Sequence, residues 1–361
     1  MRRSSLVVVS MVIVLATCAV FPFGPPTATP TVIPTLTPLP TLTAAATQSP
    51  SPSSTLRPTL TPSFTATFTA APYQLYTVPF LRARSYGGGS LELTGKMDEN
   101  QSFKRFSFRY PSDGLSIYGF MDVPQGAGPY PVIIMIHGGT PISGYSLLDY
   151  STPYADELAG AGYLVLHPAL RDYPPSDKGD NLYRVGMSID VLNLIALVKA
   201  EGGQAGPLLK ADPQRIGLWG HSVGGGVALK VITISSDVKA ALLYASLSGD
   251  DKLNFEKFTS GSNSPEAQAE AQTNALAWFQ ISPQYFLADI TAAVSIHQGL
   301  QDTIVPPAWS ADTCRRLRAL RKTVFCVNYP DMGHAFAGMT DKKFVALSVV
   351  FFDNYLKNTP P

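Results

Sequence analysis

Hydrophobic residues follow two different patterns after about residue 103. Residues 103–110 and 115–123 alternate apolar and polar side chains on either side of a Ser-Asp-Gly turn, which predicts an antiparallel hairpin at the edge of a sheet. Residues 131–137 form a continuous apolar run instead, which is typical of a central parallel strand buried on both faces.

Further along the chain, strand-like segments alternate with segments of helical periodicity. The predicted strands are 163–167, 215–219, 239–245, 293–298 and 324–328, and the predicted helices are 151–161, 182–201, one directly after 222, 308–320 and 344–356. Parallel strands joined through helices require right-handed crossovers, so the helices must lie on both faces of the sheet. The sequence therefore predicts an α/β fold with a mostly parallel central sheet.

The N-terminal part begins like a secreted protein. Arg2 and Arg3 precede an apolar run, which predicts a signal peptide or a membrane or lipid anchor over residues 1–23. Cys18 stands in a Leu-Ala-Thr-Cys sequence similar to a lipoprotein processing site, although cleavage after Ala19 and retention as a membrane anchor both stay open. We expect a location outside the cytoplasm, at the cell surface or secreted, with membrane contact only through this segment.

A second N-terminal segment, residues 24–72, is rich in Pro, Thr and Ser and almost free of charge. Such a composition offers too few large apolar side chains for a core, which predicts a disordered linker. One globular domain is expected over residues 73–361.

Composition excludes one class of partner and leaves open whether two cysteines form a disulfide. The 361 residues carry a net charge of +1 and no basic run, so no nucleic-acid partner is expected. Cys314 and Cys326 are the only cysteines of the predicted domain. They either form a disulfide, as an oxidising exterior allows, or remain two buried thiols. Their spacing does not indicate a metal site.

The candidate chemistry starts at a Gly-His-Ser-Val-Gly sequence over residues 220–224. It follows the predicted strand 215–219 and opens an Ala- and Val-rich helix. In a G-x-S-x-G at such a junction, the flanking glycines allow a sharp turn that leaves the serine hydroxyl exposed. Ser222 is therefore the candidate nucleophile.

A serine nucleophile needs a base and a group that orients the base. His334 follows the last predicted strand in a Gly-containing loop, whereas the other four histidines lie in or beside strands or within the elbow itself. Asp302 closes an earlier strand and is the candidate acid, with Asp331 or Asp289 as alternatives. Nucleophile, acid and base thus occur in the order expected of an α/β-hydrolase.

The same pattern predicts backbone donors for a developing oxyanion. One donor is the N–H of Val223, directly after the nucleophile, and the other comes from the His-Gly-Gly-Thr loop after residue 136. Gly139 is the predicted second donor, with Thr140 as the alternative. This chemistry needs no metal and no organic cofactor.

One stretch breaks the alternation of strands and helices. Residues 248–289 are polar and end in an aromatic cluster. We predict a small helical cap over the active site, because long structured insertions near the chemistry are often functional. A surface excursion away from the substrate is the alternative.

Taken together, these motifs resemble a known family. The Ser-Asp-Gly turn at 112–114, the run 131–139, the elbow 215–225, Ser282-Pro283, His297-Gln298-Gly299 with Asp302, and Gly333-His334 are similar to the catalytic domain of the prolyl oligopeptidase family. They are also similar to dienelactone-hydrolase-like and acetyl-esterase α/β-hydrolases. The resemblance covers about residues 103–356 and implies Ser222 as nucleophile, Asp302 as acid and His334 as base.

Two departures from that family shift the expected substrate. Many of its peptidases carry a large β-propeller before the hydrolase domain, which residues 73–102 are too few to form. Some members place a tyrosine hydroxyl in the oxyanion hole where this chain has His137. We therefore expect a serine hydrolase acting on small carboxylic esters, with a peptidase acting on short peptides as the alternative. A non-catalytic surface-binding protein on a hydrolase fold is a third hypothesis.

Overall fold

The computed structural model describes residues 72–358. The predicted signal or anchor at 1–23, and the predicted linker at 24–72 except its last residue, lie outside the described residues. Within 72–358, no helix is both long enough and apolar enough to span a bilayer.

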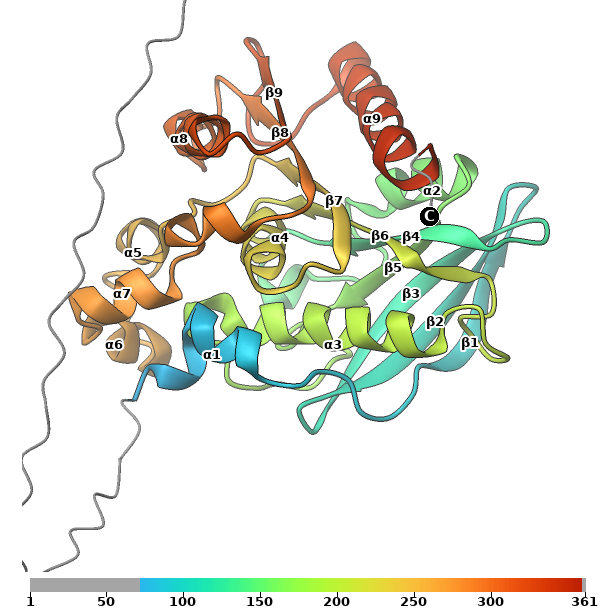
Figure 1. The fold of residues 1–361 in the computed structure, drawn as a ribbon, viewed down its shortest axis with the longest axis horizontal. Coiled ribbons are helices and arrows are strands. Elements are labelled where there is room, and N and C mark those ends of the chain that lie inside the picture. Colours follow the sequence, from blue (N-terminus) through green and yellow to red (C-terminus); the bar gives the residue numbers. More distant parts are fainter. Residues whose placement is uncertain (1–71, 359–361) are drawn as a thin grey trace, which may run out of the picture. The chain divides into compact units, whose positions relative to one another are not determined.

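The centre of the described part is a nine-stranded sheet in the order β1-β2-β3-β5-β4-β6-β7-β8-β9 (Figure 1). β1, β2, β3 and β5 pair antiparallel, and the strands from β5 through β4 to β9 pair parallel. The strands are β1 (Glu92–Glu99), β2 (Phe103–Ser112), β3 (Leu115–Pro124), β4 (Tyr130–Ile136), β5 (Leu164–Ala169), β6 (Ala211–His221), β7 (Val238–Tyr244), β8 (Ala293–Gly299) and β9 (Val324–Tyr329). This is the predicted α/β fold class with its mostly parallel sheet.

Helices cover both faces of the sheet, and each face has its own apolar core. One core lies under α3 (Val185–Glu201), α4 (Val223–Ile234) and α8 (Pro307–Ala319). The other lies under α2 (Thr152–Gly160) and α9 (Gly338–Phe352). Figure 1 shows the strands between these two sets of helices. The inner parallel strands β4, β5, β7 and β8 are buried almost throughout, which explains why their sequences are largely apolar, whereas β9 at the edge of the sheet is partly exposed.

The predicted hairpin forms, but its predicted place at the sheet edge is wrong. β2 and β3 pair from Phe103↔Pro124 to Ser112↔Leu115. β1 covers the outer side of β2, and β5 pairs with β3, so neither strand is an edge. All eight residues of β1 are exposed and its register shifts twice, so it has no buried face that a hydrophobic pattern could reveal.

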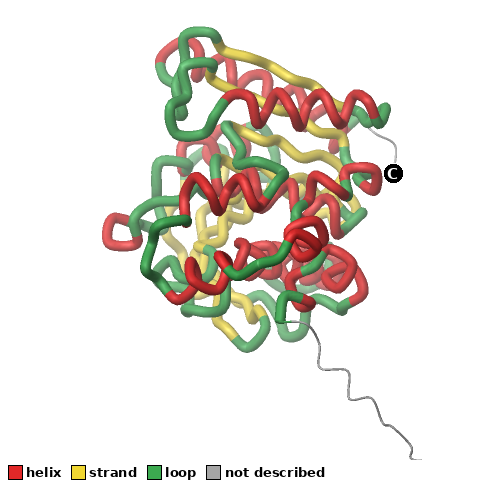
Figure 2. Tube along the Cα trace, turned by 90° about the vertical axis from the view of Figure 1, so that its left-hand side faces the viewer, coloured by secondary structure: helices red, strands yellow, loops and turns green. Residues whose placement is uncertain are grey.

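The insertion between β7 and β8 contains three short α-helices, α5 (Asp251–Asn254), α6 (Pro265–Ala271) and α7 (Ala275–Ile281), together with shorter π-helical and 3-10 segments. Buried contacts attach it to the domain. Lys230 of α4, which is 2% exposed, donates to Asp251 at 2.8 Å, and the Glu270 carboxylate accepts the Tyr183 N–H at 2.6 Å. Figure 2 shows helices and loops in front of the strands on this side of the molecule. That this insertion acts as a cap over the substrate stays a prediction.

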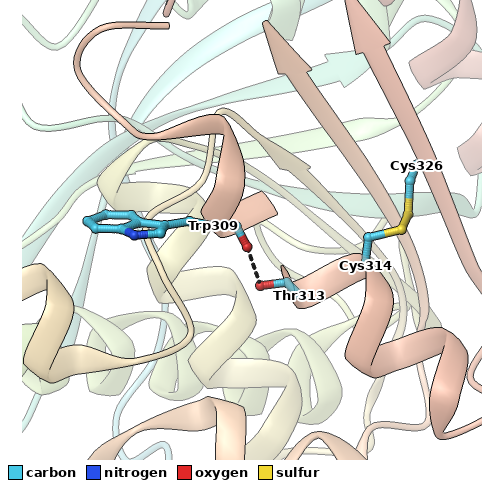
Figure 3. Close-up of a disulfide and its surroundings, with 4 residues drawn as sticks. All are labelled: Trp309, Thr313, Cys314 and Cys326. Atoms are coloured by element: carbon cyan, nitrogen blue, oxygen red, sulfur yellow. Dashed lines mark hydrogen bonds between the residues drawn. A yellow bond between two sulfur atoms is a disulfide. The ribbon is translucent and has the colours of Figure 1, made fainter. Parts of the chain in front are cut away.

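The two cysteines of the domain form a disulfide. Cys314 of α8 and Cys326 of β9 are bonded (Figure 3), which decides between the two alternatives that the sequence left open. The bond joins a helix to the strand that leads towards His334.

Candidate active site

The structure places Ser222 at the tight turn between β6 and α4, with φ 56° and ψ −115°. Positive φ is strained for a residue with a side chain, and the neighbouring glycines make room for the turn. A Cβ on Gly220 would lie 2.3 Å from the Gly224 carbonyl oxygen, and one on Gly224 would lie 2.1 Å from the Ile136 oxygen. The sequence Gly-x-Ser-x-Gly is therefore a steric requirement of this backbone.

All the predicted site residues follow the carboxyl ends of parallel strands. Gly139 follows β4, Ser222 follows β6, Asp302 follows β8 and His334 follows β9. The carboxyl ends of parallel strands all lie on the same side of the sheet, so residues far apart in sequence can approach one another there.

Asp302 and His334 are in direct contact. His334 Nδ1 lies 2.9 Å from Asp302 Oδ2. The carboxylate is fully buried, whereas the His334 side chain is 15% exposed. The alternative acids are placed differently, since Asp289 pairs with Arg82 at 2.8 Å and Asp331 is exposed.

The Asp302 carboxylate is held by several donors. Its Oδ1 accepts the N–H groups of Ile304 and Val305, both at 2.9 Å, and its Oδ2 accepts Gln298 Nε2 at 3.0 Å as well as the bond from His334. Burial alone would raise the pKa of Asp302, but the bonds from His334, Val305 and Gln298 outweigh it and hold the pKa below its usual value. The group is therefore a carboxylate near neutral pH.

The glycine loop after β4 lies directly against the elbow. A Cβ on Gly138 would be 3.3 Å from Ser222 Cβ, and a Cβ on Gly139 would be 3.0 Å from Val223 Cγ2. Two N–H groups of the loop already have partners. Gly138 donates to the Tyr150 hydroxyl at 2.8 Å, and Thr140 donates to the Tyr173 hydroxyl at 3.3 Å.

Sequence reasoning missed three side chains at this edge. Gln298 contacts Asp302, while Tyr150 and His221 contact each other at 2.6 Å. His221 and Gln298 stand within the sequence motifs, but the motifs do not show their contacts. His221 pairs with Tyr150 of another loop, and Gln298 pairs with Asp302 of the loop after its own strand. In residues 72–358, no three His, Cys, Asp or Glu side chains gather as a metal site requires.

Comparison with known proteins identifies the family. The model of the Dienelactone hydrolase family matches residues 117–351, from β3 to the end of α9. The chain belongs to the dienelactone hydrolase family. It is therefore a hydrolase, and the predicted α/β-hydrolase resemblance is confirmed.

A plant protein is similar to part of this dienelactone hydrolase family member. Chlorophyllase type 0 of Chenopodium album is 29% identical over 154 residues, which is 41% of this chain and 40% of the chlorophyllase. The chain thus spans less than half of that relative.

Solved structures share the fold at low sequence identity. Acetyl xylan esterase from Paenibacillus sp. R4 is 18% identical with a TM-score of 0.58, covering 77% of this chain and 92% of the esterase. The acylaminoacyl peptidase of Pyrococcus horikoshii is 20% identical with a TM-score of 0.57, covering 73% of this chain but 43% of the peptidase.

Proposed function

We propose that this protein is an extracytoplasmic serine hydrolase that cleaves small carboxylic esters through an acyl-Ser222 intermediate. The observation that carries the proposal is the 2.9 Å contact between His334 Nδ1 and Asp302 Oδ2 at the sheet edge where Ser222 stands on its turn. A carboxylate, an imidazole and a serine with these roles form the triad of acyl transfer.

The carboxylate determines which nitrogen of His334 can act as base. Asp302 can only accept a hydrogen bond, so Nδ1 carries the proton and Nε2 keeps its lone pair. Nε2 removes the Ser222 proton as the hydroxyl attacks the ester carbonyl, and then gives that proton to the leaving alcohol. Water repeats the sequence to release the acid.

Two backbone N–H groups are proposed to bind the oxyanion. Val223 begins α4, and the first N–H groups of a helix have no partner within the helix. Gly139 is the second donor because the N–H groups on either side of it, those of Gly138 and Thr140, are engaged by tyrosine hydroxyls. Fixed donors at the position where charge develops stabilise the transition state.

The choice of an ester substrate rests on how much of each structural neighbour is matched. The chain matches 92% of the Paenibacillus acetyl xylan esterase but 43% of the acylaminoacyl peptidase, so an ester hydrolase is the better match in extent. Cleavage of short peptides is the second candidate, favoured by the shared fold of the peptidase.

The proposed location rests on two features. Arg2 and Arg3 with the apolar run after them are typical of a secretory signal or anchor. The Cys314–Cys326 disulfide is of a kind that persists in oxidising compartments. Residues 1–23 are the proposed membrane contact, with lipid attachment at Cys18 as one form of it.

A probe and a substrate panel test the proposal. The full chain is treated with a fluorophosphonate that labels activated serines, with Ser222→Ala as control, and is then assayed on p-nitrophenyl acyl esters and on aminoacyl anilides. We expect labelling of the wild type alone and faster ester cleavage. Faster anilide cleavage would replace the esterase by the peptidase, and a folded wild type that takes no label would leave a non-catalytic binding protein.

A further inference from the structure

His221, the residue between Gly220 and the nucleophile, is packed against the base. Its ring centroid lies 4.7 Å from that of His334 and 4.4 Å from that of Tyr244. The residue is 5% exposed, and this burial, followed by the nearby His334, lowers the pKa of His221 to about 4. His221 is therefore neutral at neutral pH, with one ring nitrogen protonated and the other free to accept.

The partners of His221 determine which nitrogen carries the proton. Nε2 lies 3.1 Å from the backbone carbonyl oxygen of His334, which can only accept, so Nε2–H is the donor. Nδ1 then has the lone pair and accepts the Tyr150 hydroxyl at 2.6 Å. The Tyr150 oxygen in turn accepts the Gly138 N–H at 2.8 Å.

These bonds form one directed chain across the site. It runs from the Gly138 N–H to Tyr150, from the Tyr150 O–H to His221, and from the His221 N–H to the carbonyl of His334. The first group, the Gly138 N–H, belongs to the loop beside Ser222 that also contains Gly139. The last group, the backbone carbonyl, belongs to His334, whose side chain is the proposed base. Tyr150 as a whole residue is 43% exposed, yet its hydroxyl points inward, 2.6 Å from where a Gly138 Cβ would lie.

We propose that Tyr150 and His221 are positioning residues that couple the loop of residues 137–140 (the oxyanion loop) to the loop of residues 330–336 (the base loop), so that Gly139 and His334 keep their positions relative to Ser222. The inference rests on the proposed function and adds to it residues that need not touch the substrate. The base loop has a second support, because the Phe336 N–H donates to the Tyr244 hydroxyl at 2.5 Å. With Tyr150 or His221 altered, the carbonyl of His334 loses its link to the oxyanion loop.

The test is a double-mutant cycle on the full chain. Tyr150→Phe removes a single hydroxyl, His221→Phe removes both ring nitrogens, and the double variant removes both partners. Tyr145→Phe is the matched control, because within residues 72–358 the buried Tyr145 hydroxyl has no hydrogen-bond partner. The readouts are kcat and KM on a p-nitrophenyl ester, the rate constant of fluorophosphonate labelling, and the thermal unfolding midpoint.

We expect each single variant to lose about tenfold in kcat and in labelling rate with KM within about twofold, because misplaced catalytic groups slow the chemical step. The double variant should lose no more than about the larger single loss, since one chain is broken in both cases. His221→Gln, which can both donate and accept, should recover part of the rate.

Several results would overturn the inference. Losses that multiply in the double variant, a Tyr150→Phe rate equal to that of Tyr145→Phe, or rates that only follow the unfolding midpoint would show a merely structural role. Failure of the proposed function gives a different result, namely a folded wild type that is not labelled at all.

Discussion

Gln298 donates a hydrogen bond to Asp302 Oδ2 at 3.0 Å, the same carboxylate oxygen that contacts His334. The side-chain oxygen of Gln298 accepts the Ser310 hydroxyl of α8 at 2.7 Å, which settles the orientation of the amide. Gln298 is 1% exposed and lies on β8, so it connects Asp302, the proposed acid, to the packed core. The position of Asp302 is thus fixed by a strand and a helix as well as by its own loop.

Removing that amide should weaken the alignment of the acid. Gln298→Met keeps the length of the side chain and deletes the donor, and we expect kcat to fall about tenfold with KM little changed. Gln272→Met serves as control, because that amide is exposed and donates to the Gln268 backbone oxygen, not to Asp302. Equal kcat values in the two variants would contradict a role for Gln298 in holding Asp302.

Replacing Asp302, the proposed acid, should have a much larger effect. In Asp302→Asn the amide can donate to His334 Nδ1, which moves the proton to Nε2 and leaves no base for Ser222. We expect kcat to fall by about 10³- to 10⁴-fold, as measured on a p-nitrophenyl ester. The control is Asp331→Asn, a change at the exposed alternative carboxylate, whose kcat should match the wild type.

A buried histidine of β8 should make the free energy of unfolding depend on pH. Burial lowers the pKa of His297 to about 3, against about 6.5 in an unfolded chain, so between these values only the unfolded state binds the proton. The stabilisation by neutral His297 is complete above pH 6.5. It is lost as the pH falls, at about 1.4 kcal/mol per pH unit.

Urea unfolding at several pH values between 4 and 6.5 measures that slope. His297→Asn should reduce it by about 1.4 kcal/mol per pH unit, whatever the variant loses in hydrogen bonds to Ser295 and Tyr329 at all pH values. A slope identical to that of the wild type would mean that His297 takes up its proton in the folded state.

The disulfide should stabilise the end of the sheet that leads to His334. Cys314 and Cys326 are 12 residues apart in sequence, and closing a loop of that size contributes about 3 kcal/mol through the unfolded chain. We expect dithiothreitol to lower the free energy of unfolding by about this amount. Cys314→Ala/Cys326→Ala should be equally unstable with and without the reductant, and an unaffected wild type would contradict the prediction.

Local sequence patterns predicted much of the fold because they encode burial. The inner parallel strands are buried on both faces and have largely apolar sequences, and the turn at Ser222 requires the glycines found on either side of it. The sequence does not predict β1, because none of its side chains is buried. Without β1, the pattern places the following hairpin at the edge of the sheet, which is wrong.

The sequence by itself determined the fold class, the elbow with Ser222, and the candidates Asp302 and His334, because each depends on a short stretch of chain and its order. Only the tertiary structure decided that His334 contacts Asp302 rather than Asp289 or Asp331, that the two cysteines are bonded, and that Tyr150 and His221 link two loops. Those contacts join residues from 12 to more than 100 positions apart. Their geometry is set by how the strands pair and the helices pack, which no local pattern of side chains contains.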